Sequence, residues 1–319
     1  MRLTGSVQKG KALKNKYVFV TVMLLILMTA SIALTSLYVR HERSDNGDSF
    51  QVVTSFYPMY IAAKNIIGSC DGVTLVNLSE PQTGCMHDYQ LTAEDMKKLS
   101  LADVFVVNGG GIENFLADTA AQYPDLQMVY ASERLNLLED NAHAWMSIQD
   151  HMVQVQTIAD GLSRTDKSHS SIYQKNCADY LEKLEVLSSR QEEIAKESDS
   201  VHAVIFHEAF AYTVRDFHLE ENGSMDLDEE RQVSAGEVAD ILAQIRGNGV
   251  KLILAEELYG KRMCETVREE MPDVRAVYLD TCVRGDYEAD SYLNAMQENL
   301  NRLEEGFSYA ESCTAEAEK

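Results

Sequence analysis

The feature that most constrains the fold is a long segment, residues 168–197, that contains neither glycine nor proline. Such a segment, with apolar side chains in steps of three and four residues, is typical of a helix with one buried face. The apolar positions are Tyr173, Cys177, Tyr180, Leu184, Leu187 and Ile194. Because a helix rises about 1.5 Å per residue, this one would form a rod of roughly 43 Å, which favours a strut between two lobes.

On both sides of this segment, short apolar runs alternate with helical patterns. Gly68 suits the end of a helix, and Thr92 with Asp95 matches a capping box at the start of another. Strands are expected at 50–57 (ending near Pro58), 73–78, 103–107, 126–132, 201–206, 250–257 and 274–280, and helices at 61–68, 92–102, 234–249 and 261–271. Strands and helices that alternate at short intervals predict an α/β fold with parallel sheets.

The predicted organisation is two α/β lobes, each built on a parallel sheet and joined by the long helix. The boundaries are a basic segment 1–16, an apolar segment 17–39, a tether 40–49, a first lobe 50–167, the linking helix 168–198 and a second lobe 199–319.

The apolar segment 17–39 holds 23 consecutive uncharged residues, enough to cross a bilayer core. Five basic residues and no acid precede it, which predicts a cytoplasmic N-terminus and an extracytoplasmic position for everything beyond residue 40. The alternatives are an uncleaved anchor, which the length of the run favours, and a signal peptide cleaved near Ser31–Ala33. No cysteine precedes Cys70, which excludes a lipid-modified cysteine at the end of this segment.

Charge and cysteine content narrow the possible partners. The chain has 28 basic and 51 acidic residues, a net charge of −23, and such a surface repels phosphate backbones. We therefore expect no nucleic-acid partner. Six cysteines are present without a C-x-x-C pair, which gives little support to a thiolate zinc site or a redox motif, and their disulfide pairing stays open.

Three of the eight histidines follow predicted strands: His87 comes after the second, His143 opens the helical region after the fourth, and His207 ends the first strand of the second lobe. Asp280 closes the last predicted strand. Ligands of parallel α/β sheets bind beyond the carboxyl ends of the strands, so these four side chains could converge on one cation. Spacing alone does not choose between this metal site and ordinary structural roles. His41, His151, His169, His202 and His218 are expected to be solvated or hydrogen-bonded.

Several segments in order resemble the zinc/manganese ABC-transporter solute-binding family. They are VVTSFYPMYIAAKNIIG, NLSEPQTGCMHDYQLTAEDMKKLSLADVFVVNGGGIENF, NAHAWMS, VIFHEAFAY, SAGEVADILAQIRGNGVKLILAEE and YLDT, within about residues 50–305. The resemblance implies two Rossmann-like lobes joined by a rigid helix, with a metal ion in the cleft between them. Carried over by motif, it implies the ligands His87, His143, His207 and Asp280.

Three imidazoles with one carboxylate suit Zn²⁺, whereas Mn²⁺ prefers harder oxygen ligands. Manganese-type members of the family resemble one another in having glutamate where His207 stands, so zinc is predicted and manganese is the alternative. Glu208 is expected to point elsewhere in the alternation of the strand end and at most to support a ligand without touching the ion, and Trp145 is expected to pack in the core. Met86 stands where the family has proline before its first ligand, so either Met86 or Cys85 could approach the ion or simply pack.

The resemblance implies a binding protein without catalytic activity that delivers Zn²⁺ to a membrane permease driven by an ATPase. The chain itself has no G-x-x-x-x-G-K-[ST] phosphate-binding loop. A zinc hydrolase is disfavoured, because HEAFA has Ala211 where the H-E-x-x-H motif requires its second histidine. A zinc-binding surface adhesin remains an alternative.

Overall fold

The computed structural model describes residues 16–31, 33–34, 49–198, 201–227 and 232–317. The chain divides into two units, Met1–Ser49 and Phe50–Lys319. In the first unit, residues 16–31 form a helix whose side chains are exposed. Among the described residues, no helix combines the length and the apolarity that crossing a bilayer requires. The predicted membrane segment 17–39 lies in part outside the described residues, since positions 32 and 35–39 are not among them.

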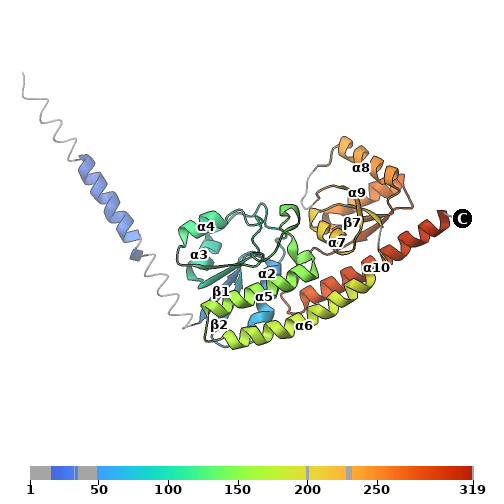
Figure 1. Ribbon diagram of the computed structural model, residues 1–319. Helices are drawn as coiled ribbons and strands as arrows, with labels where there is room; N and C mark the ends of the chain where they lie inside the picture. Colours follow the sequence, from blue (N-terminus) through green and yellow to red (C-terminus); the bar gives the residue numbers. More distant parts are fainter. Residues whose placement is uncertain (1–15, 32, 35–48, 199–200, 228–231, 318–319) are drawn as a thin grey trace, which may run out of the picture. The chain divides into compact units, whose positions relative to one another are not determined.

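The second unit begins with a parallel sheet of four strands in the order β2-β1-β3-β4 (Figure 1). The strands are β1 (Phe50–Thr54), β2 (Val73–Asn77), β3 (Val104–Val107) and β4 (Gln127–Tyr130), and the helices after the first three are α2 (Tyr57–Ile67), α3 (Ala93–Leu101) and α4 (Leu116–Gln122). Gly68 ends α2 with a φ of 60°, and Thr92 and Asp95 form the predicted capping box of α3.

The predicted end of the first strand near Pro58 is wrong, because β1 stops at Thr54 and Pro58 lies in the first turn of α2. A proline suits that place, since its fixed φ is helical and the first turn of a helix needs no N–H donor there.

A second parallel sheet has the order β6-β5-β7-β8. Its strands are β5 (His202–Ile205), β6 (Glu220–Ser224), β7 (Leu252–Ala255) and β8 (Arg275–Tyr278), and its helices include α7 (Ala211–Asp216), α8 (Ala235–Asn248) and α9 (Glu257–Glu270). The α/β fold class with two parallel sheets is therefore confirmed. Strand β6 was not predicted from the sequence, since it is a polar edge strand whose register against β5 is irregular.

Between the two sheets the chain forms two long helices, α5 (Ile148–Thr165) and α6 (Ser170–Ile194), and a third, α10 (Ser291–Ala317), follows the last strand. The predicted linking helix is α6, and the six apolar positions that predicted it are all buried. Helix α6 packs against α5, α2 and α10, and α10 runs beside it along the molecule (Figure 1). A single apolar core reaches from β1 and β3 through α2, α5 and α6 to β5 and α10. Both sheets therefore pack against one continuous core.

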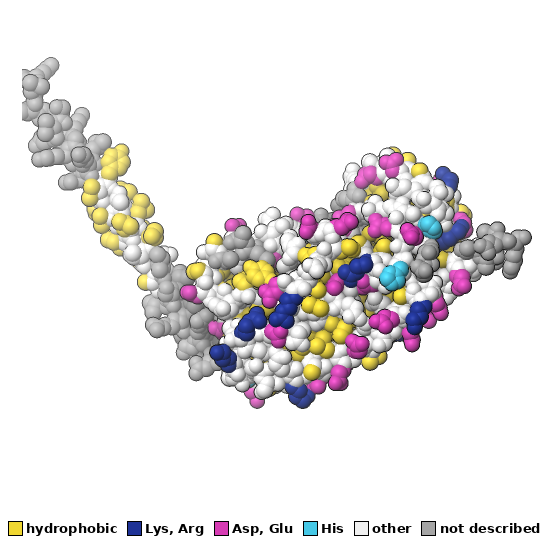
Figure 2. Space-filling view, in the orientation of Figure 1, with side chains coloured by type: hydrophobic (Ala, Val, Ile, Leu, Met, Phe, Trp, Pro, Cys, Tyr) yellow, Lys and Arg dark blue, Asp and Glu magenta, His cyan; other side chains and the backbone are white. Residues whose placement is uncertain are grey.

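A smaller apolar cluster lies between β7, α8 and α9 in the second lobe; it includes Ile241, Ile253 and Val267. On the face seen in Figure 2, acidic side chains are spread over the surface with basic ones between them, in keeping with the excess of acids.

Candidate metal centre

The loop between β2 and α3 carries His87 and Cys85. The carbonyl of His87 accepts a hydrogen bond from the Asn114 side chain, which ties this loop to the segment after β3. The His87 side chain is half-buried, with 31% of its surface exposed. Met86, between the two, is fully buried in the main core, so it packs rather than facing the site.

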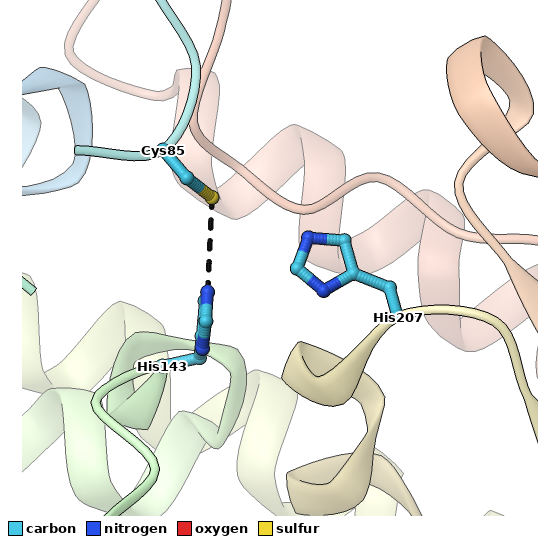
Figure 3. A group of neighbouring side chains, drawn as sticks. All are labelled: Cys85, His143 and His207. Carbon is cyan, nitrogen blue, oxygen red and sulfur yellow. Dashed lines mark hydrogen bonds between the residues drawn. The ribbon is translucent and has the colours of Figure 1, made fainter. Parts of the chain in front are cut away.

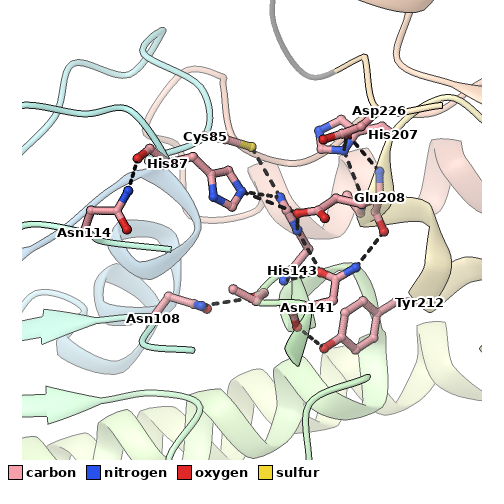
Figure 4. A network of polar contacts seen from close by, with 12 residues as sticks. Cys85, His87, Asn108, Asn114, Asn141, His143, His207, Glu208, Tyr212 and Asp226 are labelled. Carbon is pink, nitrogen blue, oxygen red and sulfur yellow. Dashed lines mark hydrogen bonds and ion pairs between the residues drawn. The ribbon is translucent and has the colours of Figure 1, made fainter. Parts of the chain in front are cut away.

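His143 lies in the loop between β4 and α5 and is fully buried. Its Nε2 atom is 3.5 Å from Nε2 of His87 and 3.7 Å from Sγ of Cys85 (Figures 3 and 4). A tetrahedral zinc ion with Zn–N bonds of about 2.0–2.1 Å needs its nitrogens about 3.3 Å apart. The two imidazoles are therefore close to the separation at which one ion can bind both.

Asn141 determines which nitrogen of His143 faces His87. The Asn141 Nδ2 atom donates to the carbonyl of Glu208 at 2.8 Å, so its Oδ1 atom is the one 2.9 Å from His143 Nδ1. An amide oxygen can only accept, and hence Nδ1 of His143 carries the proton. The lone pair is left on Nε2, which is the atom that faces His87 and Cys85. Sequence reasoning missed Asn141, although its place two residues before His143 was visible.

Burial lowers the pKa of His143 well below its ordinary value, and the neighbouring His207 and His87 lower it further. The imidazole is therefore neutral near pH 7, which is the form that binds metal ions.

His207 follows β5 and begins the short helix η3 (Glu208–Phe210). Its ring is 1% exposed and lies 5.2 Å from the His143 ring, centroid to centroid, at 86°. The Ala209 N–H donates to Nδ1 of His207 at 3.1 Å, and Asp226 Oδ1 is 3.8 Å from the same nitrogen. The second lobe thus brings an imidazole to the two of the first lobe.

The expectation that Glu208 points elsewhere is wrong, although its contact with Nδ1 of His143 suits the supporting role that was left open for it. Its Oε1 atom lies 3.3 Å from His143 Nδ1 and 3.6 Å from His87 Nε2 (Figure 4). The expectation assumed that strand alternation continues to residue 208, but β5 ends at Ile205 and the chain turns into η3. This turn directs the carboxylate toward the histidines.

In the described part of the chain, two groups of metal-ligating side chains have donor atoms within 4.8 Å of one another. They are Cys85 with His143 and His207, and His87 with His143 and Glu208. Three of the four predicted ligands thus gather around His143. Asp280 belongs to neither group: its side chain is exposed after β8, where Oδ1 accepts from the Cys282 N–H at 2.7 Å.

Other histidines and the tryptophan were predicted to have structural roles, and their contacts are as follows. His151, His169 and His202 each lie within hydrogen-bonding distance of a side chain, at 3.2 Å from Gln154, 2.6 Å from Asp166 and 2.6 Å from Asn222. His218 lies in a turn with a φ of 53°. Trp145 is buried, and its indole N–H donates to the Thr281 carbonyl at 2.9 Å.

The buried carboxyl group of Glu113 supports the loop of His143 through a chain of hydrogen bonds. Glu113 accepts from the backbone N–H groups of Asn108 and Gly109 and from the Ser55 hydroxyl. The Asn108 side chain in turn donates to the Ala142 carbonyl at 2.9 Å, next to His143 (Figure 4). Burial raises the pKa of Glu113 to about 7, against the effect of these hydrogen bonds. Sequence reasoning did not identify Glu113, since nothing in the spacing marks it.

The chain has two α/β lobes with parallel sheets, a long helix between them, and imidazoles from both lobes near one another. This combination defines the class of two-lobed solute-binding proteins. Residues 52–306 match the family described as zinc-uptake complex component A, periplasmic (ZnuA). The chain belongs to this family.

Among the relatives, the high-affinity zinc uptake system protein ZnuA of Bacillus subtilis is 25% identical over 283 residues, which cover 81% of this chain and 88% of that protein. The manganese ABC transporter substrate-binding lipoprotein PsaA of Streptococcus anginosus is 24% identical over 307 residues, covering 89% and 98%.

Two solved structures show the same fold at 25% identity. The solute-binding protein FpvC of Pseudomonas aeruginosa in complex with Ni²⁺ has a TM-score of 0.73 and covers 82% of this chain and 97% of its own. The Zn(II)-bound ZnuA-like domain of Streptococcus pneumoniae AdcA has a TM-score of 0.70, with 81% and 98% covered.

Proposed function

We propose that this protein captures Zn²⁺ outside the cytoplasm and delivers it to an ABC permease whose ATPase lies on the cytoplasmic side. The observation that carries the proposal is the meeting of His87, His143 and His207 from two lobes, with two imidazole nitrogens 3.5 Å apart. Membership of the ZnuA family supports it, as do relatives named for zinc uptake and for manganese ABC transport.

The donor set favours zinc over manganese. Neutral imidazoles suit Zn²⁺, whereas a manganese site is usually richer in oxygen donors. His207 supplies nitrogen from the second lobe, and Glu208 is the single carboxylate within the donor groups of the described residues. Mn²⁺ remains the alternative cargo, and one relative is named a manganese-binding lipoprotein.

For the fourth position we propose either Asp280, the carboxylate that the family resemblance implies from the second lobe, or a donor nearer the imidazoles. To reach the imidazoles the Asp280 side chain would have to leave the hydrogen bond with the Cys282 N–H. Its backbone is held on both sides by Asn299, which bonds the N–H and the carbonyl of Asp280 at 2.8 Å each.

No catalytic role is part of this proposal. A hydrolytic zinc site needs an open coordination position and a base placed to activate water. Here Glu208 lies against His143 and His87, and the position that would complete H-E-x-x-H is Ala211. Purified protein loaded with zinc is expected to show no metal-dependent peptidase or esterase turnover.

We also propose that residues 17–39 either anchor the protein in the membrane or direct its secretion before cleavage. The uncharged run of 23 residues and the basic residues before it support this. The family description "periplasmic" and relatives named lipoproteins agree with a position outside the cytoplasm. Sequencing of the mature N-terminus from membrane and soluble fractions distinguishes the two outcomes.

Competitive titration of the purified protein with Zn²⁺ and Mn²⁺ tests the function. We expect one ion per chain and tighter binding of zinc. His207→Ala should weaken zinc binding by at least about 100-fold, since it removes a donor atom and changes in outer hydrogen bonds alone cost 10–100-fold. His202→Ala, a change outside the site, should bind as the unaltered protein does. Manganese binding more tightly than zinc would contradict the assignment of the cargo.

A further inference from the structure

The thiol of Cys85 lies among the imidazoles of the candidate metal centre. Its Sγ atom is 3.7 Å from Nε2 of His143, and its donor atom lies within 4.8 Å of those of His143 and His207 (Figure 3). Cys85 comes from the same loop as His87, is partly buried, and is a reduced thiol. Three donors from three different loops therefore already surround a common point.

The distances from His143 to Cys85 and to His87 are those expected of ligands of one zinc ion. With Zn–S bonds of about 2.3 Å and Zn–N bonds of about 2.0–2.1 Å, a tetrahedral ion places its sulfur and nitrogen about 3.6 Å apart. The distance from Cys85 Sγ to His143 Nε2 is 3.7 Å. The distance from His143 Nε2 to His87 Nε2, 3.5 Å, is likewise near the tetrahedral value of about 3.3 Å for two nitrogens.

The other predicted fourth ligand is less well placed. The Asp280 carboxylate belongs to neither donor group and accepts a hydrogen bond from the Cys282 N–H. Cys85 packs against the edge of the main core, but unlike the fully buried Met86 it also keeps its Sγ atom 3.7 Å from Nε2 of His143. Cys177, Cys264 and Cys282 are buried elsewhere and belong to no donor group of the described residues.

We infer that Cys85 is a ligand of the bound ion together with His143 and His207, and that His87 joins them from the neighbouring group that it forms with His143 and Glu208, which gives three nitrogens and one sulfur. This inference rests on the proposed function and replaces Asp280 in the fourth position. As the metal–sulfur bond forms, the thiol releases one proton to solvent, and no electron is transferred. A thiolate is a soft donor, so it favours Zn²⁺ and disfavours Mn²⁺ at this site.

X-ray absorption at the zinc edge of the full-length protein, loaded with one equivalent of Zn²⁺, tests the inference without any variant. We expect one sulfur at about 2.3 Å together with nitrogens at about 2.0–2.1 Å. A shell of nitrogen and oxygen alone would overturn the inference and leave the proposed function standing. Failure to bind any divalent ion would overturn both.

Variants provide the second arm of the test. Cys85→Ser should lose the sulfur signal and bind zinc at least about 100-fold more weakly, while Cys313→Ser, the matched change on α10, should keep both. Cys85→Asp should narrow the preference for zinc over manganese, because it substitutes a harder oxygen donor. Unchanged zinc affinity in folded Cys85→Ser, as judged by its circular dichroism, would contradict the inference.

Discussion

At the scale of single residues, Asn141 links the two lobes at the candidate metal centre. Its amide bridges His143 of the first lobe and the Glu208 carbonyl of the second, and its own carbonyl accepts from the Tyr212 hydroxyl at 2.6 Å. The residue is therefore placed to fix the tautomer of His143 and to hold the lobes at the distance that the site requires.

We expect Asn141→Ala to weaken zinc binding by about 10–100-fold, the usual cost of removing a hydrogen-bond partner of a metal ligand. Asn141→Asp should lose less, because a carboxylate still accepts from Nδ1 of His143. Asn248→Ala, on the exposed face of α8, is the control and should not change affinity. Titration with zinc measures all three, and equal affinities of Asn141→Ala and the control would refute this role.

Glu113 should make stability depend on pH near neutrality. Its pKa is about 7 in the folded protein and ordinarily 4.5, so the folded state binds the proton more tightly. The contribution of Glu113 to the free energy of unfolding is fully present below pH 4.5. It falls by about 3 kcal/mol in all as the pH rises through 7.

Urea unfolding at a series of pH values measures this effect. In Glu113→Gln the loss of stability between pH 5 and pH 8 should be smaller, since the side chain no longer titrates. Glu185→Gln, at an exposed position of α6, should keep the slope of the unaltered protein. Identical slopes in all three proteins would show that Glu113 does not titrate in this range.

At the same scale, the sequence places His87, His143 and His207 at the ends of strands, and in the structure His87 and His207 each lie beside His143. The reason is general, because parallel strands end at one edge of a sheet. The orientation of Glu208 was not predictable, since it depends on where β5 ends and η3 begins. Asn141 and Glu113 act through hydrogen bonds made across the fold, which no local spacing reveals.

At the scale of elements, α6 was predicted by its apolar period, and its buried positions are the ones that the period selected. The strand β6 and the helix α10 were not predicted. Strand β6 has the polar sequence EENGS and lies at the edge of its sheet. It therefore shows neither an alternation of apolar residues nor the high hydropathy by which a strand is recognised in a sequence. The predicted end of the first strand near Pro58 is wrong because proline is equally suited to the end of a strand and to the first turn of a helix.

Helix α6 offers a matched pair of substitutions. Leu184 is fully buried against the main core, and Val186, two residues later, is 71% exposed. Leu184→Ala should lower the free energy of unfolding by about 2–5 kcal/mol, whereas Val186→Ala should change it by no more than about 0.5 kcal/mol. Denaturant unfolding followed by circular dichroism measures both, and similar losses would contradict the burial of this face.

At the scale of the whole molecule, one core connects the two sheets, so the lobes are not independent hinged bodies. Release of an ion held by donors from both lobes then requires a local change at the loops that carry them. The loop that carries His87 follows β2, the loop that carries His143 follows β4, and the loop that carries His207 follows β5. These are the segments in which the loaded and unloaded proteins are expected to differ.

The charge of the molecule is consistent with its proposed cargo. Beyond residue 43 the chain holds 21 basic and 50 acidic residues, a balance that repels polyanions and attracts cations. Such attraction is not specific, and selection among cations depends on the donor atoms of the site.

Anomalous X-ray diffraction at the zinc edge, from crystals of the zinc-loaded protein, tests the central claim most directly. A single strong peak is expected at bonding distance, about 2.0–2.1 Å, from nitrogens of His87, His143 and His207. A peak that none of these histidines binds, or three imidazoles without metal between them in crystals that contain zinc, would contradict the account.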